Sequence, residues 1–406
     1  MAFWPSIVVA TPAHSGVGAT LTYRSELSLA PGALVRVPLG SREVLGVVWD
    51  CPDAPPEGLT EARTKAVAGV LEGLPALNGC WRQLVKFSAQ YYQRSLGEVA
   101  LAALPPQLRG LDSTQLARRL KKRAKAGTAG PATPGELSGH DLSDEQAEAL
   151  QALAAASTPV LLFGATGSGK TEVYLRATQA VLETTVSDGE SPTQVLVMVP
   201  EINLTPQLEA RFRERFEPGF GAGSVVCLHS GMTPAQRLSS WLAAHTGSAR
   251  IVLGTRMAVF ASLPGLRLIV VDEEHDPSYK QQEGARYSAR DLAIWRARDT
   301  GAKVILGSAT PSLESWHASD PAVGRYVRLA MPSRIGAGAL ARVRRVDMNQ
   351  QPRRAIFSAP LLAAITERVA RGEQSMVLLN RRGYAPVLHC ADCGWKSDCP
   401  HCSAHQ

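Results

Sequence analysis

Six short apolar runs beyond residue 141 are the feature that most limits how this chain folds. Each run has the length of one buried strand, and most are followed by a turn and a stretch of helical periodicity. Strands that alternate with helices in this way form a doubly wound parallel sheet, an α/β fold with helices on both faces. Ligands of such sheets bind beyond the carboxyl ends of the strands. The expected strands are 160–163, 195–199, 225–229, 251–254, 268–271 and 304–307.

The first hundred residues follow a different pattern, with short β-rich runs between glycine, proline and serine turns. Runs at 7–10, 33–38 and 44–49 predict a small sheet or barrel, and the apolar spacing of 81–92 predicts a helix. We therefore expect a separate β-rich domain at 1–104.

Residues 105–140 differ from both neighbouring regions in composition. They begin with two prolines, continue with a basic run and end in a glycine- and proline-rich stretch without periodicity, which predicts a tethered, partly disordered linker. The basic run has two interpretations, a solvated helix face or a patch that follows phosphates, and the sequence leaves both open. Its residues are Arg118, Arg119, Lys121, Lys122, Arg123 and Lys125.

Composition narrows the class of partner. Of the 406 residues 45% are hydrophobic and 19% are charged, which is ordinary for a globular protein. The formal net charge of +7 favours a polyanion such as nucleic acid as the partner. No apolar run reaches the ~18 residues of a membrane span, and the amino terminus lacks the features of a secretory signal. We therefore expect a cytoplasmic protein.

A glycine-rich loop follows the run at 160–163 and precedes a helical stretch at 171–182. It fits the pattern G-x-x-x-x-G-K-[ST], whose glycines let backbone N–H groups wrap phosphates at the start of a helix. In this pattern Lys170 contacts the β- and γ-phosphates, and the Thr171 hydroxyl ligates Mg²⁺. The predicted nucleotide site consists of Gly164, Ala165, Thr166, Gly167, Ser168, Gly169, Lys170 and Thr171.

Two acids, Asp272 and Glu273, come directly after the run at 268–271. A carboxylate at the end of a buried strand is costly unless a cation lies near it. We expect Asp272 to help hold Mg²⁺ and Glu273 to polarise the attacking water, although a solvated acidic helix start is the alternative. Upstream, the amide of Gln146 is suited to donate to and accept from an adenine edge, whereas an ordinary surface glutamine is the alternative.

The segment after these acids mixes aromatic rings with cations, the composition of a platform for single-stranded nucleic acid. It lies one loop from the expected catalytic acid, so that a change there can reach the nucleotide. A surface loop with aromatic residues by chance is the alternative. The residues are Tyr279, Lys280, Arg286, Tyr287 and Arg290.

The order of these motifs resembles that of superfamily 2 helicases, which also carry strings similar to Gly254-Thr-Arg256, Asp272-Glu-Glu-His275 and Gly307-Ser-Ala-Thr-Pro311. Two longer strings resemble the PriA family (primosomal protein N′) of bacterial replication-restart helicases. These strings are Asp276-Pro-Ser-Tyr-Lys-Gln-Gln-Glu-Gly-Ala-Arg-Tyr287 and Leu379-Asn-Arg-Arg-Gly-Tyr-Ala-Pro386. The resemblance covers about 1–104 and 141–406.

The resemblance implies an amino-terminal domain that binds the 3′ end of a nascent DNA strand, with Arg36, Gly40 and Lys65 in the matching segments and Arg256 as a further DNA contact. It does not extend to the family's Phe-Asp-Tyr string, which is Leu21-Thr-Tyr23 here and lacks the carboxylate. We expect no winged helix in the short linker. Members of the family also have a second helicase lobe. Their partners are other primosome proteins and single-stranded-DNA-binding protein.

Four of the seven cysteines form two C-x-x-C pairs near the end of the chain, Cys390 with Cys393 and Cys399 with Cys402. Each pair is a strong half-site for Zn²⁺. The family binds two zinc ions with four such pairs, so we expect the two pairs of this sequence to hold zinc incompletely. One shared four-cysteine site and unmetallated thiols are the alternatives.

The rest of the chain is expected to contain three segments. A first helicase lobe occupies 141–330, and a connector with the start of the second lobe occupies 331–388, including a strand at 376–379. The partial zinc segment occupies 389–406.

The leading hypothesis is an ATP-dependent DNA helicase that recognises stalled or branched replication forks and initiates primosome assembly at the bacterial nucleoid. A non-catalytic scaffold that binds ATP and DNA without unwinding is the alternative, because rapid hydrolysis usually needs an arginine from a second element. A P-loop kinase or GTPase is disfavoured by the acid tetrad, by Gly307-Ser-Ala-Thr-Pro311 and by the lack of an Asn-Lys-x-Asp string.

Overall fold

The computed structural model of the chain divides into two compact units, Met1–Gly338 and Ala339–Gln406. Within the part of the chain that the structure describes, no helix is long and apolar enough to cross a membrane. The described residues are 2–11, 18–59, 64–111, 113–126, 141–184, 191–200, 206–335, 342–352 and 355–379.

A seven-stranded sheet lies at the centre of the first unit, and every neighbouring pair of its strands is parallel. The order β12-β6-β11-β10-β7-β9-β8 puts β10 in the middle. Except at the edge strand β12, the strands are apolar and almost wholly buried, as a sheet covered on both faces requires. The strands are β6 (Val160–Gly164), β7 (Gln194–Met198), β8 (Val225–Leu228), β9 (Ile251–Gly254), β10 (Leu266–Val271), β11 (Lys303–Ser308) and β12 (Val327–Met331).

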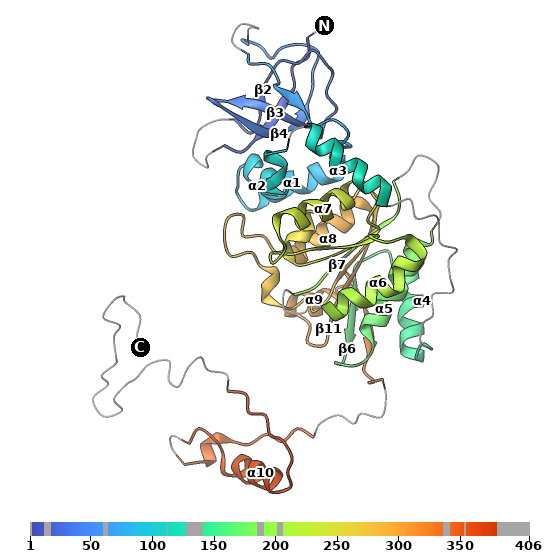
Figure 1. Ribbon diagram of the computed structural model, residues 1–406. Helices are drawn as coiled ribbons and strands as arrows, with labels where there is room; N and C mark the ends of the chain where they lie inside the picture. The colour runs from blue at the N-terminus through green and yellow to red at the C-terminus, as the bar shows by residue number, and fades with distance from the viewer. Residues whose placement is uncertain are drawn as a thin grey trace, which may run out of the picture. The chain divides into compact units, whose positions relative to one another are not determined.

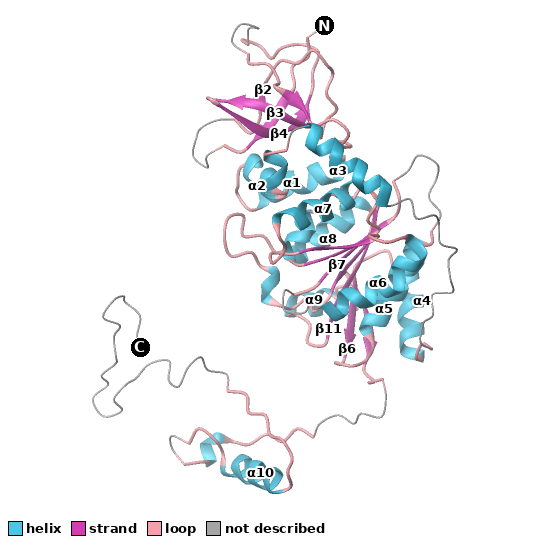
Figure 2. Ribbon diagram, in the orientation of Figure 1, coloured by secondary structure: helices cyan, strands magenta, loops and turns pink. Residues whose placement is uncertain are grey.

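Helices cover both faces of this sheet, as Figures 1 and 2 show. Alternate strand residues point to opposite faces, so Leu161 packs in the apolar cluster of α7 and α8, whereas Val160 and Leu162 pack in that of α4, α5 and α6. The predicted doubly wound fold and its six strands are confirmed. The helices are α4 (Asp144–Ala155), α5 (Lys170–Leu182), α6 (Pro206–Phe220), α7 (Pro234–His245) and α8 (Ala289–Thr300).

Two strand predictions differ from the structure. The edge strand β12 was not expected. Its residues show neither a continuous apolar run nor a regular alternation, and only Met331 is buried. The strand predicted at 376–379 is not formed, and Met376 is 97% exposed. A strand needs a neighbour for its backbone groups, and the described part of the second unit offers only α10 (Ala359–Ala370) and a 3₁₀ turn (Met348–Gln350).

The amino-terminal part forms a small antiparallel sheet of order β2-β1-β4-β3-β5, followed by two helices. Only two residues, Gly40 and Ser41, join β3 to β4, and the φ of +63° at Gly40 suits such a tight hairpin. The predicted small sheet and first helix are confirmed. The elements are β1 (Ser6–Val9), β2 (Leu21–Thr22), β3 (Leu34–Leu39), β4 (Arg42–Asp50), β5 (Gly69–Val70), α1 (Gly79–Tyr91) and α2 (Leu96–Ala102).

The segment predicted as a tethered, partly disordered linker is folded in its first part. It contains a 3₁₀ turn at Pro106–Arg109 and the helix α3 at Ser113–Ala126, which carries the backbone of the basic run. Leu108 and Leu116 are fully buried, so apolar anchors that the basic composition concealed attach this segment to the core. Residues 127–140 lie outside the described part of the chain.

A shared core joins the amino-terminal part to the α/β part. Trp81 of α1 is 1% exposed, and its indole N–H donates to the Phe260 carbonyl at 2.9 Å. His245 of α7 donates from Nε2 to the Pro75 carbonyl at 2.8 Å. One apolar cluster runs through both parts, from Val8 to Leu306. The amino-terminal domain therefore forms one folded body with the lobe.

We expect Trp81→Ala to lower the free energy of unfolding by about 3–5 kcal/mol, because it leaves a large cavity in this shared core and an unpaired carbonyl. Urea unfolding followed by circular dichroism measures the change. Trp316→Ala is the matched control, since that ring is 40% exposed and should cost about 1 kcal/mol. Equal losses in the two variants would contradict the assigned role of Trp81.

Candidate nucleotide and nucleic-acid site

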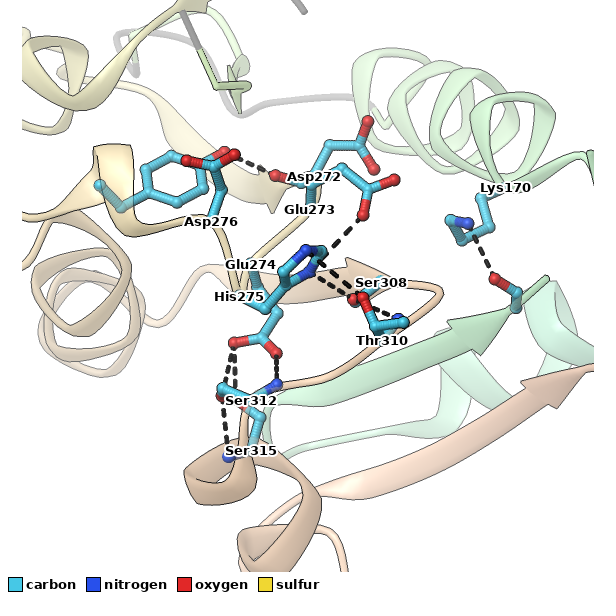
Figure 3. Close-up of polar contacts among 12 residues, drawn as sticks. Lys170, Asp272, Glu273, Glu274, His275, Asp276, Ser308, Thr310, Ser312 and Ser315 are labelled. Carbon is cyan, nitrogen blue, oxygen red and sulfur yellow. Dashed lines mark hydrogen bonds and ion pairs between the residues drawn. The ribbon is translucent and has the colours of Figure 1, made fainter. Parts of the chain in front are cut away.

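The glycine-rich loop joins the end of β6 to the start of α5, as predicted. Gly167 and Gly169 have φ of +85° and +84°, a conformation that side chains disfavour, so glycine is required at both turns. The Lys170 ammonium donates to the Gly164 carbonyl at 2.9 Å (Figure 3). Among the described residues the buried Ser168 hydroxyl has no hydrogen-bond partner. A helix start with a nearly buried lysine and an unpaired hydroxyl fits phosphate oxygens as ligands.

Asp272 follows β10 and faces the same side of the site as Lys170 (Figure 3). Its Oδ1 accepts a hydrogen bond from the Tyr174 hydroxyl at 2.9 Å. Burial raises the pKa of the Asp272 carboxyl above its ordinary value, and the Tyr174 hydroxyl and the Lys170 charge lower it in part. A buried carboxylate is a suitable ligand for Mg²⁺, and the role of Thr171, at the start of α5, as a second ligand stays a prediction.

Glu273 adopts an unusual backbone conformation next to this acid. Its φ of +45° lies in the left-handed region, which costs a non-glycine residue of order 1 kcal/mol. Burial, followed by the charge of Asp272, raises the pKa of the Glu273 carboxyl. The strained backbone aims the Glu273 carboxylate to the side of the site on which Asp272 lies (Figure 3).

The buried Glu274 and the exposed His275 complete the acid tetrad, and sequence reasoning gave neither a role. His275 Nδ1 lies 2.8 Å from the hydroxyl of Ser308, the last residue of β11, which connects the acids to the end of that strand. Glu274 is 1% exposed and accepts from the Ser312 amide at 2.7 Å and from the Ser315 hydroxyl at 2.9 Å. Ser312 caps the short helix α9 (Leu313–Ala318), so Glu274 attaches that helix to the acid tetrad (Figure 3).

Gln146 lies beside the phosphate loop, where its amide is already engaged. Its Oε1 accepts from the Ser143 amide at 2.9 Å, and its Nε2 donates to the Gly169 carbonyl at 3.2 Å. The first contact completes the capping box of α4. The structure therefore brings Gln146 to the glycine-rich loop, and its contact with an adenine edge stays a prediction.

Internal contacts occupy the polar groups of Tyr279, Arg290 and Arg36, which were predicted to contact DNA. Tyr279 is 3% exposed and donates its hydroxyl to the Asp272 carbonyl at 2.6 Å, so its ring is not available for stacking on a base. Arg290 lies 3.3 Å from the buried Glu274 carboxylate and satisfies that charge. Arg36 donates to the Arg109 and Leu111 carbonyls.

The other predicted DNA contacts remain accessible. Lys280 and Arg286 are exposed, and Lys65 donates to the Gly40 carbonyl at 3.0 Å on the surface of the amino-terminal domain. Arg256 and the half-buried Tyr287 line a groove of about 450 Å³ between α2 and the loop after the acids. The four cysteines Cys390, Cys393, Cys399 and Cys402 lie outside the described residues, within which there is no cluster of potential metal ligands.

Comparison with known proteins places this architecture. Residues 6–105 match the family of the 3′DNA-binding domain (3′BD) of PriA, and residues 143–318 match the DEAD/DEAH box helicase family. The replication restart protein PriA of Haemophilus influenzae is 34% identical over 93% of this chain and 58% of its own length. PriA of Treponema pallidum is 33% identical, with 99% and 58% covered, and PriA of Bacillus subtilis is 41% identical, with 60% and 29% covered.

A parallel sheet with this phosphate loop and acid tetrad, within the helicase match, defines the ATP-binding lobe of a helicase that follows a 3′-DNA-binding domain. The relatives make the comparison more specific: the chain is similar to replication restart protein PriA across both matched domains. It spans about 58% of the length of the Haemophilus and Treponema relatives.

We expect Glu273→Gly to be more stable than Glu273→Gln by about 1 kcal/mol, because glycine adopts the φ of +45° without strain while both variants lose the charge. Thermal unfolding of the two purified variants measures the difference. If the glutamine variant is as stable as the glycine variant, the backbone at this position is not strained.

Proposed function

We propose that the chain is the ATP- and DNA-binding part of a replication-restart helicase, which recognises stalled or branched forks and unwinds DNA at the expense of ATP. One observation carries this proposal. A phosphate loop and an acid pair occupy a lobe that shares its hydrophobic core with a 3′-DNA-binding domain. A site that hydrolyses ATP is thereby attached to a domain that contacts DNA.

In this proposal, ATP places its phosphates in the glycine-rich loop, and Lys170 exchanges the Gly164 carbonyl for phosphate oxygens. Thr171 and Asp272 hold Mg²⁺, which neutralises phosphate charge when bound. Glu273 orients the attacking water and accepts its proton. Glu274 and His275 hold the acids against α9 and the segment after β11. Hydrolysis then changes contacts in a network that extends toward the loop after the acids.

The finer parts of the proposal concern partners. By analogy with the relatives, the complete assembly includes other primosome proteins and single-stranded-DNA-binding protein, and it acts at the nucleoid. The two cysteine pairs serve as thiolate ligands for Zn²⁺. A scaffold that binds ATP and DNA without unwinding would show nucleotide affinity but no DNA-stimulated hydrolysis, and a DNA-stimulated ATPase assay separates the two functions.

We expect Lys170→Ala to abolish binding of a labelled, non-hydrolysable ATP analogue, because the cradle then loses its only predicted phosphate-contacting cation. Equilibrium fluorescence titration in the presence of Mg²⁺ measures the affinity. Lys86→Ala, which removes an exposed lysine from α1, should bind the analogue like the wild type. Unchanged affinity in Lys170→Ala would remove the nucleotide site from the proposal.

Binding of single-stranded or forked DNA should weaken steeply with salt, since the net charge of +7 and the basic run on α3 imply counterion release. Changing all six basic residues of the run to glutamine should lower both the affinity and the salt slope, as measured by fluorescence anisotropy. Glutamines at Arg342, Arg344 and Arg345 form the control. An equal loss per charge in the control would show that α3 contributes only through net charge.

A further inference from the structure

The amino-terminal domain contacts the loop behind the catalytic acids through Tyr92, which ends α1. The Tyr92 hydroxyl accepts a hydrogen bond from the Ser288 amide at 3.0 Å. The ammonium of Lys280 lies 5.4 Å from the centre of the Tyr92 ring, within the range of a cation–π interaction. One side chain of the DNA-binding domain therefore contacts two residues that are eight positions apart in the lobe.

These two residues form the base of one loop, 280–288, which we call the coupling loop. Lys280 and Ser288 pair as an isolated antiparallel bridge, and the Gln281 amide donates to the Tyr287 carbonyl at 2.9 Å. The coupling loop thus leaves and rejoins the lobe at the point that Tyr92 contacts. A shift of Tyr92 would move both ends of the loop together.

Each end of the coupling loop leads directly to the acid tetrad. Tyr279, the residue before Lys280, donates its hydroxyl to the backbone carbonyl of Asp272. Arg290, two residues after Ser288, pairs with the carboxylate of Glu274 and donates to the Ser312 hydroxyl at 2.9 Å. The position of the loop base therefore fixes contacts on both sides of Glu273.

The tip of the coupling loop faces the same DNA-binding domain across the groove of about 450 Å³. Gln281, Gly284 and Tyr287 line it from the loop, while Glu98 and Val99 line it from α2. A strand in this groove would contact the lobe and the domain at once.

The rest of the junction is built differently. Trp81 and His245 are 1% and 2% exposed, and they bind carbonyls in the fixed core of the junction. Tyr92 is only partly buried against that core, so its contacts with the loop can change while the domain stays in place.

We infer that Tyr92 is a positioning residue through which the 3′-DNA-binding domain controls the nucleotide site. This inference rests on the proposed function. The coupling loop has two arrangements, and the Tyr92–Ser288 hydrogen bond belongs to one of them. DNA on the amino-terminal domain changes the balance between them, so it changes ATP affinity, and ATP changes DNA affinity by the same factor.

Tyr92→Phe tests this inference, because it keeps the ring over Lys280 and removes the hydroxyl that accepts from Ser288. Tyr91→Phe is the matched control, since this neighbouring ring is 67% exposed. The affinity of a fluorescent ATP analogue is measured with and without an oligonucleotide that has a free 3′ end. We expect DNA to change the affinity of the wild type and Tyr91→Phe by about fivefold or more, and that of Tyr92→Phe by less than twofold.

Hydrogen exchange of residues 279–291 provides a second readout that requires no ligand. The Ser288 amide should exchange about tenfold faster in Tyr92→Phe than in the wild type. Unchanged exchange would show that the Tyr92 hydroxyl does not hold the base of the coupling loop. Wild-type coupling in Tyr92→Phe, or a wild type that binds both ligands without coupling, would overturn the control of the nucleotide site. A wild type that binds neither ligand would instead overturn the proposed function, while the exchange comparison still decides whether Tyr92 holds the loop.

Discussion

A carboxylate at the buried end of the central strand is the constraint on which the rest of the site depends. Asp272 follows β10, the central strand, which has three strands on each side. Few positions in a protein are buried enough to raise the pKa of a carboxyl and still open to a ligand. Tyr174 reaches it from α5 by passing over Gly307, where a Cβ would collide with the tyrosine hydroxyl. The glycine of β11, the tyrosine of α5 and the acid of β10 are therefore mutually dependent choices.

Two residues of the acid tetrad face the glycine-rich loop, and the other two bind the surrounding lobe. Asp272 and Glu273 lie toward Lys170, whereas His275 binds the hydroxyl at the end of β11 and Glu274 binds an amide and hydroxyls of the segment that follows it (Figure 3). Buried acids are tolerated only when hydrogen bonds or cations satisfy them, and Glu274 has both. The four consecutive residues thus join a catalytic surface to the element that must respond to it.

The sequence predicted the fold and the place of the glycine-rich loop between β6 and α5 well, because both rest on local rules. Strands buried on both faces are continuous apolar runs, and phosphate loops require glycine at fixed spacings. The same rules missed which polar side chains turn inward. Tyr279 and Arg290 have the composition of a nucleic-acid surface, yet they satisfy the Asp272 carbonyl and the Glu274 carboxylate, partners that no periodicity reveals. Arg36 likewise binds carbonyls 73 and 75 residues away. Contacts at such separations depend on how the domains pack.

The common apolar cluster of the two parts has a consequence for how the chain is divided. The family matches divide the chain into two segments, which end at residue 105 and begin at residue 143. Cooperativity does not follow that division, because Val8, Trp81 and Leu306 belong to one core. A fragment cut at the family boundary would expose to water the apolar faces that now meet at the junction. The segment that each family match covers is therefore smaller than the unit that unfolds cooperatively. Heat or denaturant should unfold both segments in a single transition.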